Sequence, residues 1–329
     1  MKKKLIALAI AGAMTAPMAA MADVKISGGL QSQVGSISNG DTNLRMGSGG
    51  IQDSNGQDFG TFGAMHINAS ESLGGGMTAL ASYGFNIQTG GGINTRQAFV
   101  GLSGDFGTVL AGQIQRPYTS STVGWDPFLG TFMQARGNGG MGGSFSSQLY
   151  GGEMPNVLAY ANEFGGVRLV AGVVVDQTTE NNHAYSFSIN APVGPVELAF
   201  AHIDASEHGS AYDGDDGPAL ANVDKAAATK VGVRYSAGDL TVAGQYEMFD
   251  DGLGDGNAMF MTASYKIGAN TLSASVGMED EEVGDRTYMA FGVLHALSQK
   301  SRLHAGIRMT DWDNGDDETA IGAGLRVSF

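Results

Sequence analysis

The feature that most constrains this chain is a regular alternation of apolar residues with polar or small ones in short segments. Between 321 and 329, apolar side chains occupy every second position, with Gly, Arg and Ser between them. Between 167 and 175, five apolar residues share the face opposite Arg168. Because successive side chains of a strand point to opposite faces, a period of two predicts β-strands with one apolar face.

Sixteen such segments follow one another along the chain. They are expected near 24–36, 58–71, 76–87, 94–103, 106–115, 154–163, 166–176, 183–191, 194–203, 229–237, 239–249, 257–267, 270–279, 285–297, 301–311 and 319–329. This series predicts an all-β protein.

The connections between these segments are of two kinds, which alternate. The short turns are 72–75, 104–105, 164–165, 192–193, 238, 268–269 and 298–300. The other connections are generally longer and mostly acidic: 37–57, 88–93, 116–153, 177–182, 204–228, 250–256, 280–284 and 312–318. Short turns at one end and long loops at the other are typical of outer-membrane β-barrels.

Both ends of the series lie at the short-turn end, so the first and last strands can pair. Their pairing would close the sheet and remove the edge strands that lipid cannot satisfy. A soluble β-sandwich would also alternate, but it does not separate its connections so consistently. The sequence therefore predicts a transmembrane antiparallel β-barrel of sixteen strands over residues 23–329.

The first 22 residues have the pattern of a secretory signal peptide. Lys2–Lys4 precede an apolar stretch from Leu5 to Met18, and Ala20–Ala22 provides a small-x-small cleavage site. The apolar stretch is shorter than the roughly 20 residues of a spanning helix. No apolar run in the rest of the chain approaches that length, which excludes a helical membrane protein.

The charge of the chain restricts its partners. The formal charge is −15, and the expected leader holds three lysines and no acidic residue, so residues 23–329 carry −18. This acidity argues against nucleic acid as a partner, because phosphate binding needs clustered Lys and Arg. Cysteine is absent, so no disulfide supports the fold. No cofactor is implied.

Four segments resemble a known family, the general Gram-negative porins, particularly the neisserial and burkholderial type. Residues 70–77 (SESLGGGM) are similar to its S-E-D-L-G-G-G-L turn, and residues 96–108 (RQAFVGLSGDFGT) to its hairpin R-x-A-F-V-G-L-x-G-x-F-G-T. Residues 297–301 (LSQKS) resemble its L-S-K-R-T turn, and residues 324–329 (GLRVSF) its closing G-L-R-x-x-F. The resemblance implies a homotrimer of barrels and a third loop, 116–153, folded into the lumen. It also implies that Phe329 is an assembly signal.

The same resemblance suggests a pore constriction. It makes Asp126 the carboxylate of the inward loop and Arg96 an arginine of the wall. Three positions at which the family has arginine are Ala64, Gln113 and Glu153 in this chain. Arg116 replaces part of the charge lost at 113. The predicted constriction is therefore formed by Arg96, Arg116, Asp126 and Glu153. The alternative is an external loop with solvated charges, which the apolar residues of 125–132 disfavour because they require burial.

Further arginines are expected on the polar face of the barrel. They are Arg168, Arg302, Arg308 and Arg326, with His304 beside them. Such side chains either set a transverse field together with the acids of the loop or only keep the lumen hydrated, and the sequence leaves both readings open. Arg168 and Arg302 lie next to short turns.

Other patterns point to no separate function. Residues 137–142 fit G-x-G-x-x-G, but no helix start follows them, and a glycine-rich chain produces such a match by chance. The acidic runs at 213–216, 250–251, 279–282 and 313–318 do not match an EF-hand and predict a solvated outer surface, with weak divalent-cation bridging to lipopolysaccharide as the alternative. The six histidines form no nucleophile–base set at one depth, which disfavours an enzyme. A receptor or adhesin role of the long loops is compatible with a porin and stays open.

The sequence thus predicts an outer-membrane channel for passive diffusion of ions and small hydrophilic solutes. Sixteen strands enclose a water-filled lumen, and an inserted loop narrows it. Strongly acidic loops concentrate cations at the mouth, so weak cation selectivity is expected. The expected surroundings are outer-membrane lipid and lipopolysaccharide.

Overall fold

The computed structural model describes residues 22–38, 43–47, 63–87, 89, 92–136, 141, 153–175, 183–205, 227–250, 255–281, 284–313 and 315–329. The expected signal peptide lies outside these residues, apart from Ala22. Among the described residues, none of the helices has the length and apolar character needed to cross a membrane.

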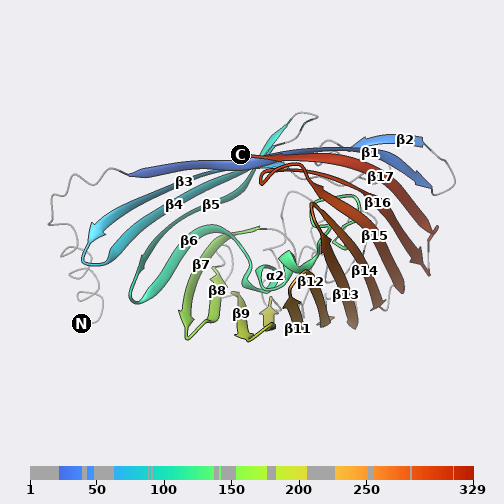
Figure 1. The fold of residues 1–329 in the computed structure, drawn as a ribbon. Coiled ribbons are helices and arrows are strands. Elements are labelled where there is room, and N and C mark those ends of the chain that lie inside the picture. The colour runs from blue at the N-terminus through green and yellow to red at the C-terminus, as the bar shows by residue number, and fades with distance from the viewer. Residues whose placement is uncertain are drawn as a thin grey trace.

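The described chain is almost entirely β-strand (Figure 1). The strands are β1 (Asp23–Ser38), β2 (Asn43–Gly47), β3 (Gly63–Gly74), β4 (Met77–Ile87), β5 (Ile93–Gly104), β6 (Gly107–Gln115), β7 (Glu153–Phe164), β8 (Val167–Val174), β9 (Ala184–Val193), β10 (Val196–Asp204), β11 (Ala227–Ala237), β12 (Leu240–Asp250), β13 (Asp255–Ile267), β14 (Asn270–Glu281), β15 (Arg286–Ala296), β16 (Ser301–Trp312) and β17 (Glu318–Ser328). Two short helices, α2 (Pro117–Ser120) and the 3₁₀ helix η1 (Val123–Trp125), follow β6.

The sheet closes on itself. From β3 to β17 each strand pairs antiparallel with the next, and β1 pairs with β17 from Gly29↔Ser328 to Ser38↔Thr319. On its other side β1 pairs with two strands, with β3 along Asp23–Leu30 and with β2 along Gln33–Ile37. β2 and β3 therefore share one position of the barrel. The predicted closed antiparallel barrel of sixteen strand positions is confirmed.

The expectation that residues 37–57 form a connection without strands is wrong. Within that range, β2 (Asn43–Gly47) extends the ladder of β1 where β3 does not reach. Leu44 and Met46 alternate with polar residues, but the segment is much shorter than the roughly ten-residue segments of a membrane barrel and therefore did not stand out from the polar stretches around it. The other strand boundaries agree with the expected ones to within a few residues, except that the expected start of one strand at 58 lies outside the described residues, in which β3 begins at Gly63.

The two faces of the barrel wall differ in chemistry. Val231, Val233, Phe291, Leu303 and Ile321 belong to a large set of exposed apolar side chains on one face, and about 40–60% of the surface of most is exposed. Most of the alternate positions carry polar, charged or small residues, as is typical of a membrane barrel with a hydrated lumen, and buried apolar residues such as Phe249 and Phe260 occur among them.

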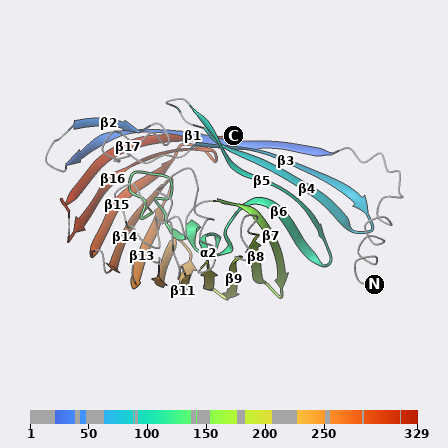
Figure 2. The ribbon, with the colours of Figure 1, turned by 180° about the vertical axis from the view of Figure 1, so that it is seen from behind.

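The segment after β6 contacts the polar face. Figures 1 and 2 show α2 and the residues after it within the space that the strands enclose. Tyr118, Phe128, Phe132 and Met133 are completely buried there. These loop residues thus form one buried apolar cluster together with wall residues such as Phe260.

Candidate channel constriction

Arg96 and Glu153 form an ion pair between β5 and β7. The Arg96 Nε lies 2.9 Å from a Glu153 carboxylate oxygen, and about a third of the arginine side chain is exposed. Gln97 pairs with Gly84 and Thr95 with Phe85, so Arg96 is the extra residue of a β-bulge. Bulges redirect the side chain that they insert. The structure thus brings together the two wall residues predicted for the constriction.

Uncharged polar side chains surround this pair on β3, β4 and β5. The Gln97 amide donates to the Ser82 hydroxyl at 3.2 Å and lies 3.3 Å from the Nδ1 of His66. The Ser82 hydroxyl donates to the Asn68 side chain at 2.8 Å. Arg96 therefore provides the positive charge among the described side chains of this stretch of wall, and Glu153 pairs with it.

Asp126 has hydrogen bonds within its own loop. Its two carboxylate oxygens accept the backbone N–H groups of Phe128 and Ala135, both at 2.8 Å. Burial raises the pKa of Asp126 from 3.8 to about 6, although the N–H groups of Ala135 and Phe128 and the charge of Arg136 act in the opposite direction. The carboxylate thus shapes the loop as well as adding charge to it.

Arg136 is a neighbour of these groups that sequence reasoning missed. Burial lowers the pKa of its guanidinium, Glu153 raises that pKa, Arg96 and Arg116 lower it, and Asp126 raises it. All four predicted constriction residues therefore act on Arg136 electrostatically. A signal existed in the sequence, because Arg116 and Arg136 are the two basic residues between 116 and 153.

The four arginines predicted on the polar face fall into two groups. Arg308 forms an ion pair with Glu318, and Arg326 donates to Gln31 at 2.7 Å; both also bind the backbone of the third loop. Arg302 lies directly opposite Arg326 in the β16–β17 register, and the exposed Arg168 lies opposite Glu163. Two of the predicted wall charges therefore hold the loop, and two lie near the short turns.

Other ion pairs on the wall were not predicted. Arg234 pairs with Glu197, and Arg286 lies 3.7 Å from Glu279. The guanidinium of Arg234 also faces the ring of Trp125 at 5.7 Å. Among the described residues, no group of three or more His, Asp or Glu side chains is placed to hold a metal ion.

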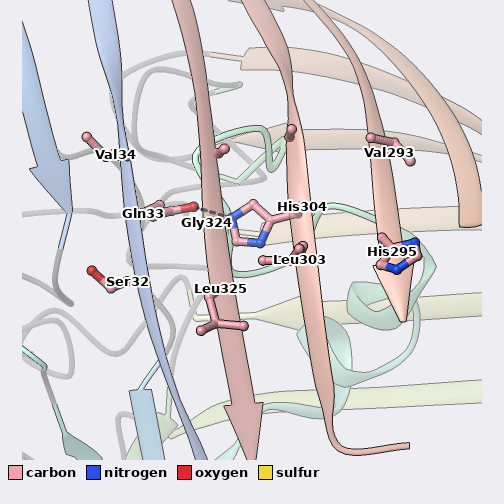
Figure 3. Close-up of a pocket in the computed structure, with 11 residues that line it drawn as sticks. Ser32, Gln33, Val34, Val293, His295, Leu303, His304, Gly324 and Leu325 are labelled. Carbon is pink, nitrogen blue, oxygen red and sulfur yellow. Dashed lines mark hydrogen bonds between the residues drawn. The ribbon is translucent and has the colours of Figure 1, made fainter. Parts of the chain in front are cut away.

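A hollow of about 540 Å³ lies between β1, β15, β16 and β17, but it faces away from the loop (Figure 3). Its walls include Val34, Leu303 and Leu325, which are exposed apolar residues of the outer face. His304 and Gln33 bond to each other at 2.8 Å on the inner side. The hollow is therefore separate from the constriction.

A closed sixteen-stranded barrel with an apolar outer belt and a polar, arginine-bearing interior defines an outer-membrane β-barrel channel. The family model of the Gram-negative porins matches residues 7–315, and the chain belongs to this family. The resemblance found in the sequence and the outer-membrane location are thereby confirmed. Family and fold indicate a channel and not an enzyme.

Solved porin structures share the fold. An anion-selective porin from Comamonas acidovorans is 18% identical, with a TM-score of 0.74 over 94% of this chain and 100% of the other. A loop-deletion mutant of OmpT from Vibrio cholerae is 17% identical, with a TM-score of 0.69 over 94% and 99%. OmpF of Salmonella typhi, in complex with daunomycin, is 13% identical, with a TM-score of 0.69 over 93% and 97%. No curated protein sequence matches the chain.

Proposed function

We propose that the protein is a general diffusion channel in which the third loop, 116–153, narrows the lumen. The observation that carries this proposal is the position of 116–136. Its described residues bond to β1, β9, β12, β15, β16 and β17, whereas the Arg96–Glu153 pair stands on β5 and β7. Ions and small hydrophilic solutes then pass between the loop and the wall from β3 to β6.

The constriction of this proposal contains Arg96, Arg116, Asp126 and Glu153, with Arg136 added. These five groups carry a net charge of about +1 when both acids are ionised. Such a small net charge gives the narrow part a weak field, because Arg96 and Glu153 neutralise each other at 2.9 Å.

Weak cation selectivity is proposed for the whole channel. Residues 23–329 carry −18, and the basic side chains Arg234, Arg286 and Arg308 are each paired with a glutamate. Acidic charge at the mouth raises the local concentration of cations. The porin from Comamonas acidovorans is anion-selective, but at 18% identity its likeness to this chain concerns the fold alone.

The proposed assembly is a homotrimer in the outer membrane, with lipid and lipopolysaccharide against the apolar belt. One of the similar structures is a trimer form of OmpT from Vibrio cholerae. The belt of exposed apolar side chains provides the surface that lipid or a second copy would cover. Native mass spectrometry in mild detergent tests this point, and a monomer would contradict it.

Export and assembly complete the proposal: 1–22 is a cleaved leader, and Phe329 marks the chain for assembly. The backbone of Phe329 pairs with Gly28, with N–H···O distances of 2.9 and 3.1 Å, and its ring is 46% exposed. An accessible terminal aromatic beside the closing strand pair fits such a role. Deletion of Phe329 should lower the amount of protein in the outer membrane, and wild-type levels would contradict the role.

Planar-bilayer recording tests the function. Purified protein should give discrete ohmic current steps, and poly(ethylene glycol) above a sharp size limit should leave the conductance unchanged. Absence of steps from folded protein would overturn the proposal. A size limit as wide as that of an unobstructed sixteen-stranded lumen would show that the loop does not narrow it.

A further inference from the structure

The third loop is held by its backbone and not mainly by its polar side chains. Arg326 Nη2 donates to the carbonyl oxygens of Leu129 and Gly130, at 3.1 and 2.9 Å, and the Gln31 amide donates to Gly130 O at 2.5 Å. Arg308 Nη1 donates to Phe132 O at 2.7 Å. The donors come from β1, β16 and β17.

Two more side chains of the wall bond the backbone of the loop. The Tyr288 hydroxyl of β15 donates to the carbonyl oxygen of Met133. The side-chain oxygen of Gln33 accepts the N–H of Phe132 at 3.2 Å and is also bonded to His304. Backbone groups buried without partners are costly, so the fit of these donors fixes where the loop can lie.

Glycines of the wall form a seat beneath the same stretch of loop. Gly292 and Gly306 face each other across β15 and β16. A Cβ on Gly306 would collide with the Met133 sulfur and with the carbonyl oxygen of Phe291 in the wall, and one on Gly292 would lie 2.7 Å from that sulfur and 3.0 Å from the Phe128 ring. The loop side chains therefore fill the space that the missing side chains of the wall leave.

Arg308 belongs both to the side chains that bond the loop backbone and to the stretch of wall around Gly306. Its side chain is completely buried, lies two residues from Gly306 on the same face of β16, and pairs with Glu318 of β17. A charged donor bonds a carbonyl more strongly than a neutral one. The Arg308–Glu318 pair thus presents a fixed cation to Phe132 O.

We propose that Arg308, aimed by Glu318, is the positioning residue that seats the third loop on the glycines of β15 and β16 and thereby sets the cross-section of the channel. This inference rests on the proposed function, because the loop has to border the solute path for its position to matter. The loop then behaves as a fixed part of the wall and not as a moving gate.

The test removes the pair without leaving a buried charge. Arg308→Met combined with Glu318→Gln should still give a closed barrel, but with severalfold larger current noise in the open channel and a shifted polymer size limit. The matched control is Arg168→Met with Glu163→Gln, an exposed cross-strand Arg–Glu pair away from the loop, which should leave both readouts at wild-type values. The single variant Arg308→Lys should show less open-channel noise than the double variant, because it keeps a cation at this position.

A disulfide separates positioning from general damage. The chain has no cysteine, and Ala290→Cys with Met133→Cys puts one thiol in the wall and one in the loop, at two members of the same buried cluster. In the Arg308→Met, Glu318→Gln background, oxidation should return the noise and the size limit to wild-type values, and reduction should reverse this. Unchanged noise in that background, or no effect of oxidation, would overturn the inference.

The outcomes of the two proposals are distinguishable. If wild-type protein conducts but the Arg308 variant behaves like it, only the positioning inference fails. If wild-type protein does not conduct at all, the proposed function fails, and the position of the loop is judged by how fast the Met133→Cys, Ala290→Cys variant cross-links. Rapid cross-linking that slows on loss of Arg308 supports the seat, and equal rates overturn it.

Discussion

Two stretches of the barrel wall share the same strand pattern and use their charges differently. On β15–β17 and β1, Arg308 and Arg326 bind the backbone of the third loop. On β3–β7, Arg96 stands at a bulge beside uncharged side chains, with Glu153 as its partner. The comparison teaches that an arginine on the polar face of a barrel is not by itself a selectivity determinant. Its partner decides whether it supports the structure or faces the solute.

The largest effect on stability should come from breaking the buried Arg308–Glu318 pair, on the part of the wall that contacts the third loop. Glu318→Ala leaves Arg308 buried without its carboxylate, which should lower the free energy of unfolding by about 3–5 kcal/mol. Glu163→Ala, at an exposed pair, should cost less than about 1 kcal/mol. Equilibrium unfolding in urea and detergent measures both. Equal losses would remove the distinction between the two kinds of arginine.

A charge reversal on the stretch of wall that carries Arg96, which we call the open wall, should act on ion selectivity and not on stability. Glu153→Arg converts the 2.9 Å pair with Arg96 into two positive charges at the constriction. The permeability ratio should shift severalfold toward anions, as read from the zero-current potential across a KCl gradient. Glu163→Arg provides the control with the same charge change near a short turn. A shift of the same size in both variants would show that the pair does not lie at the narrowest point.

Loss of one loop charge should have a smaller effect, in the other direction. Arg136→Gln removes a cation that Glu153, Arg96, Arg116 and Asp126 all influence. The zero-current potential should shift toward cation selectivity, because the substitution removes a positive charge from the constriction. The shift should be smaller than that of Glu153→Arg, because the net charge changes by one and not by two. Arg168→Gln is the matched control, and the inclusion of Arg136 in the constriction is wrong if the two variants move the potential equally.

The smallest effect should be a pH dependence from Asp126. Because its pKa is raised to about 6, the carboxyl is neutral below pH 6 and negative above it. Selectivity for cations should therefore increase as the pH rises from about 5 to 7.5, by an amount that Asp126→Asn removes. The difference between wild type and the Asp126→Asn variant at each pH is the quantity that matters. No difference at any pH would exclude Asp126 from the field of the pore.

The strands of the barrel wall could be predicted from the sequence, but the contacts between the wall and the third loop could not. Strands such as Ser301–Trp312 follow from alternation, because lipid on one side and water on the other force a period of two. β2 was not predicted, because its five residues are far fewer than the roughly ten of a membrane-barrel strand. The bulge at Arg96 also escaped, since an inserted residue does not interrupt an apolar pattern that is already broken by Gln97 and Thr95.

The site shows the same limit. Alternation put Arg308 and Arg326 on the polar face, but their partners are backbone carbonyls of a loop that lies far away in the sequence. Backbone groups have no sequence signature, so no motif could reveal this contact. Asp126 was expected to face the wall, and its bonds to Phe128 and Ala135 depend on a loop conformation that only the fold defines. The predicted roles of Arg96, Arg116, Asp126 and Glu153 in conduction stay predictions.

Thiol accessibility tests most directly whether solutes pass along the stretch of wall that carries Arg96 and not along the stretch that contacts the third loop. Asn68→Cys lies on the open wall, and Ala290→Cys lies beneath the seated loop, where the residue is 4% exposed. The chain has no other cysteine to interfere. A charged methanethiosulfonate added during bilayer recording should change the conductance of Asn68→Cys within seconds and leave that of Ala290→Cys unchanged. Equal modification of both positions, or modification of Ala290→Cys alone, would contradict the account.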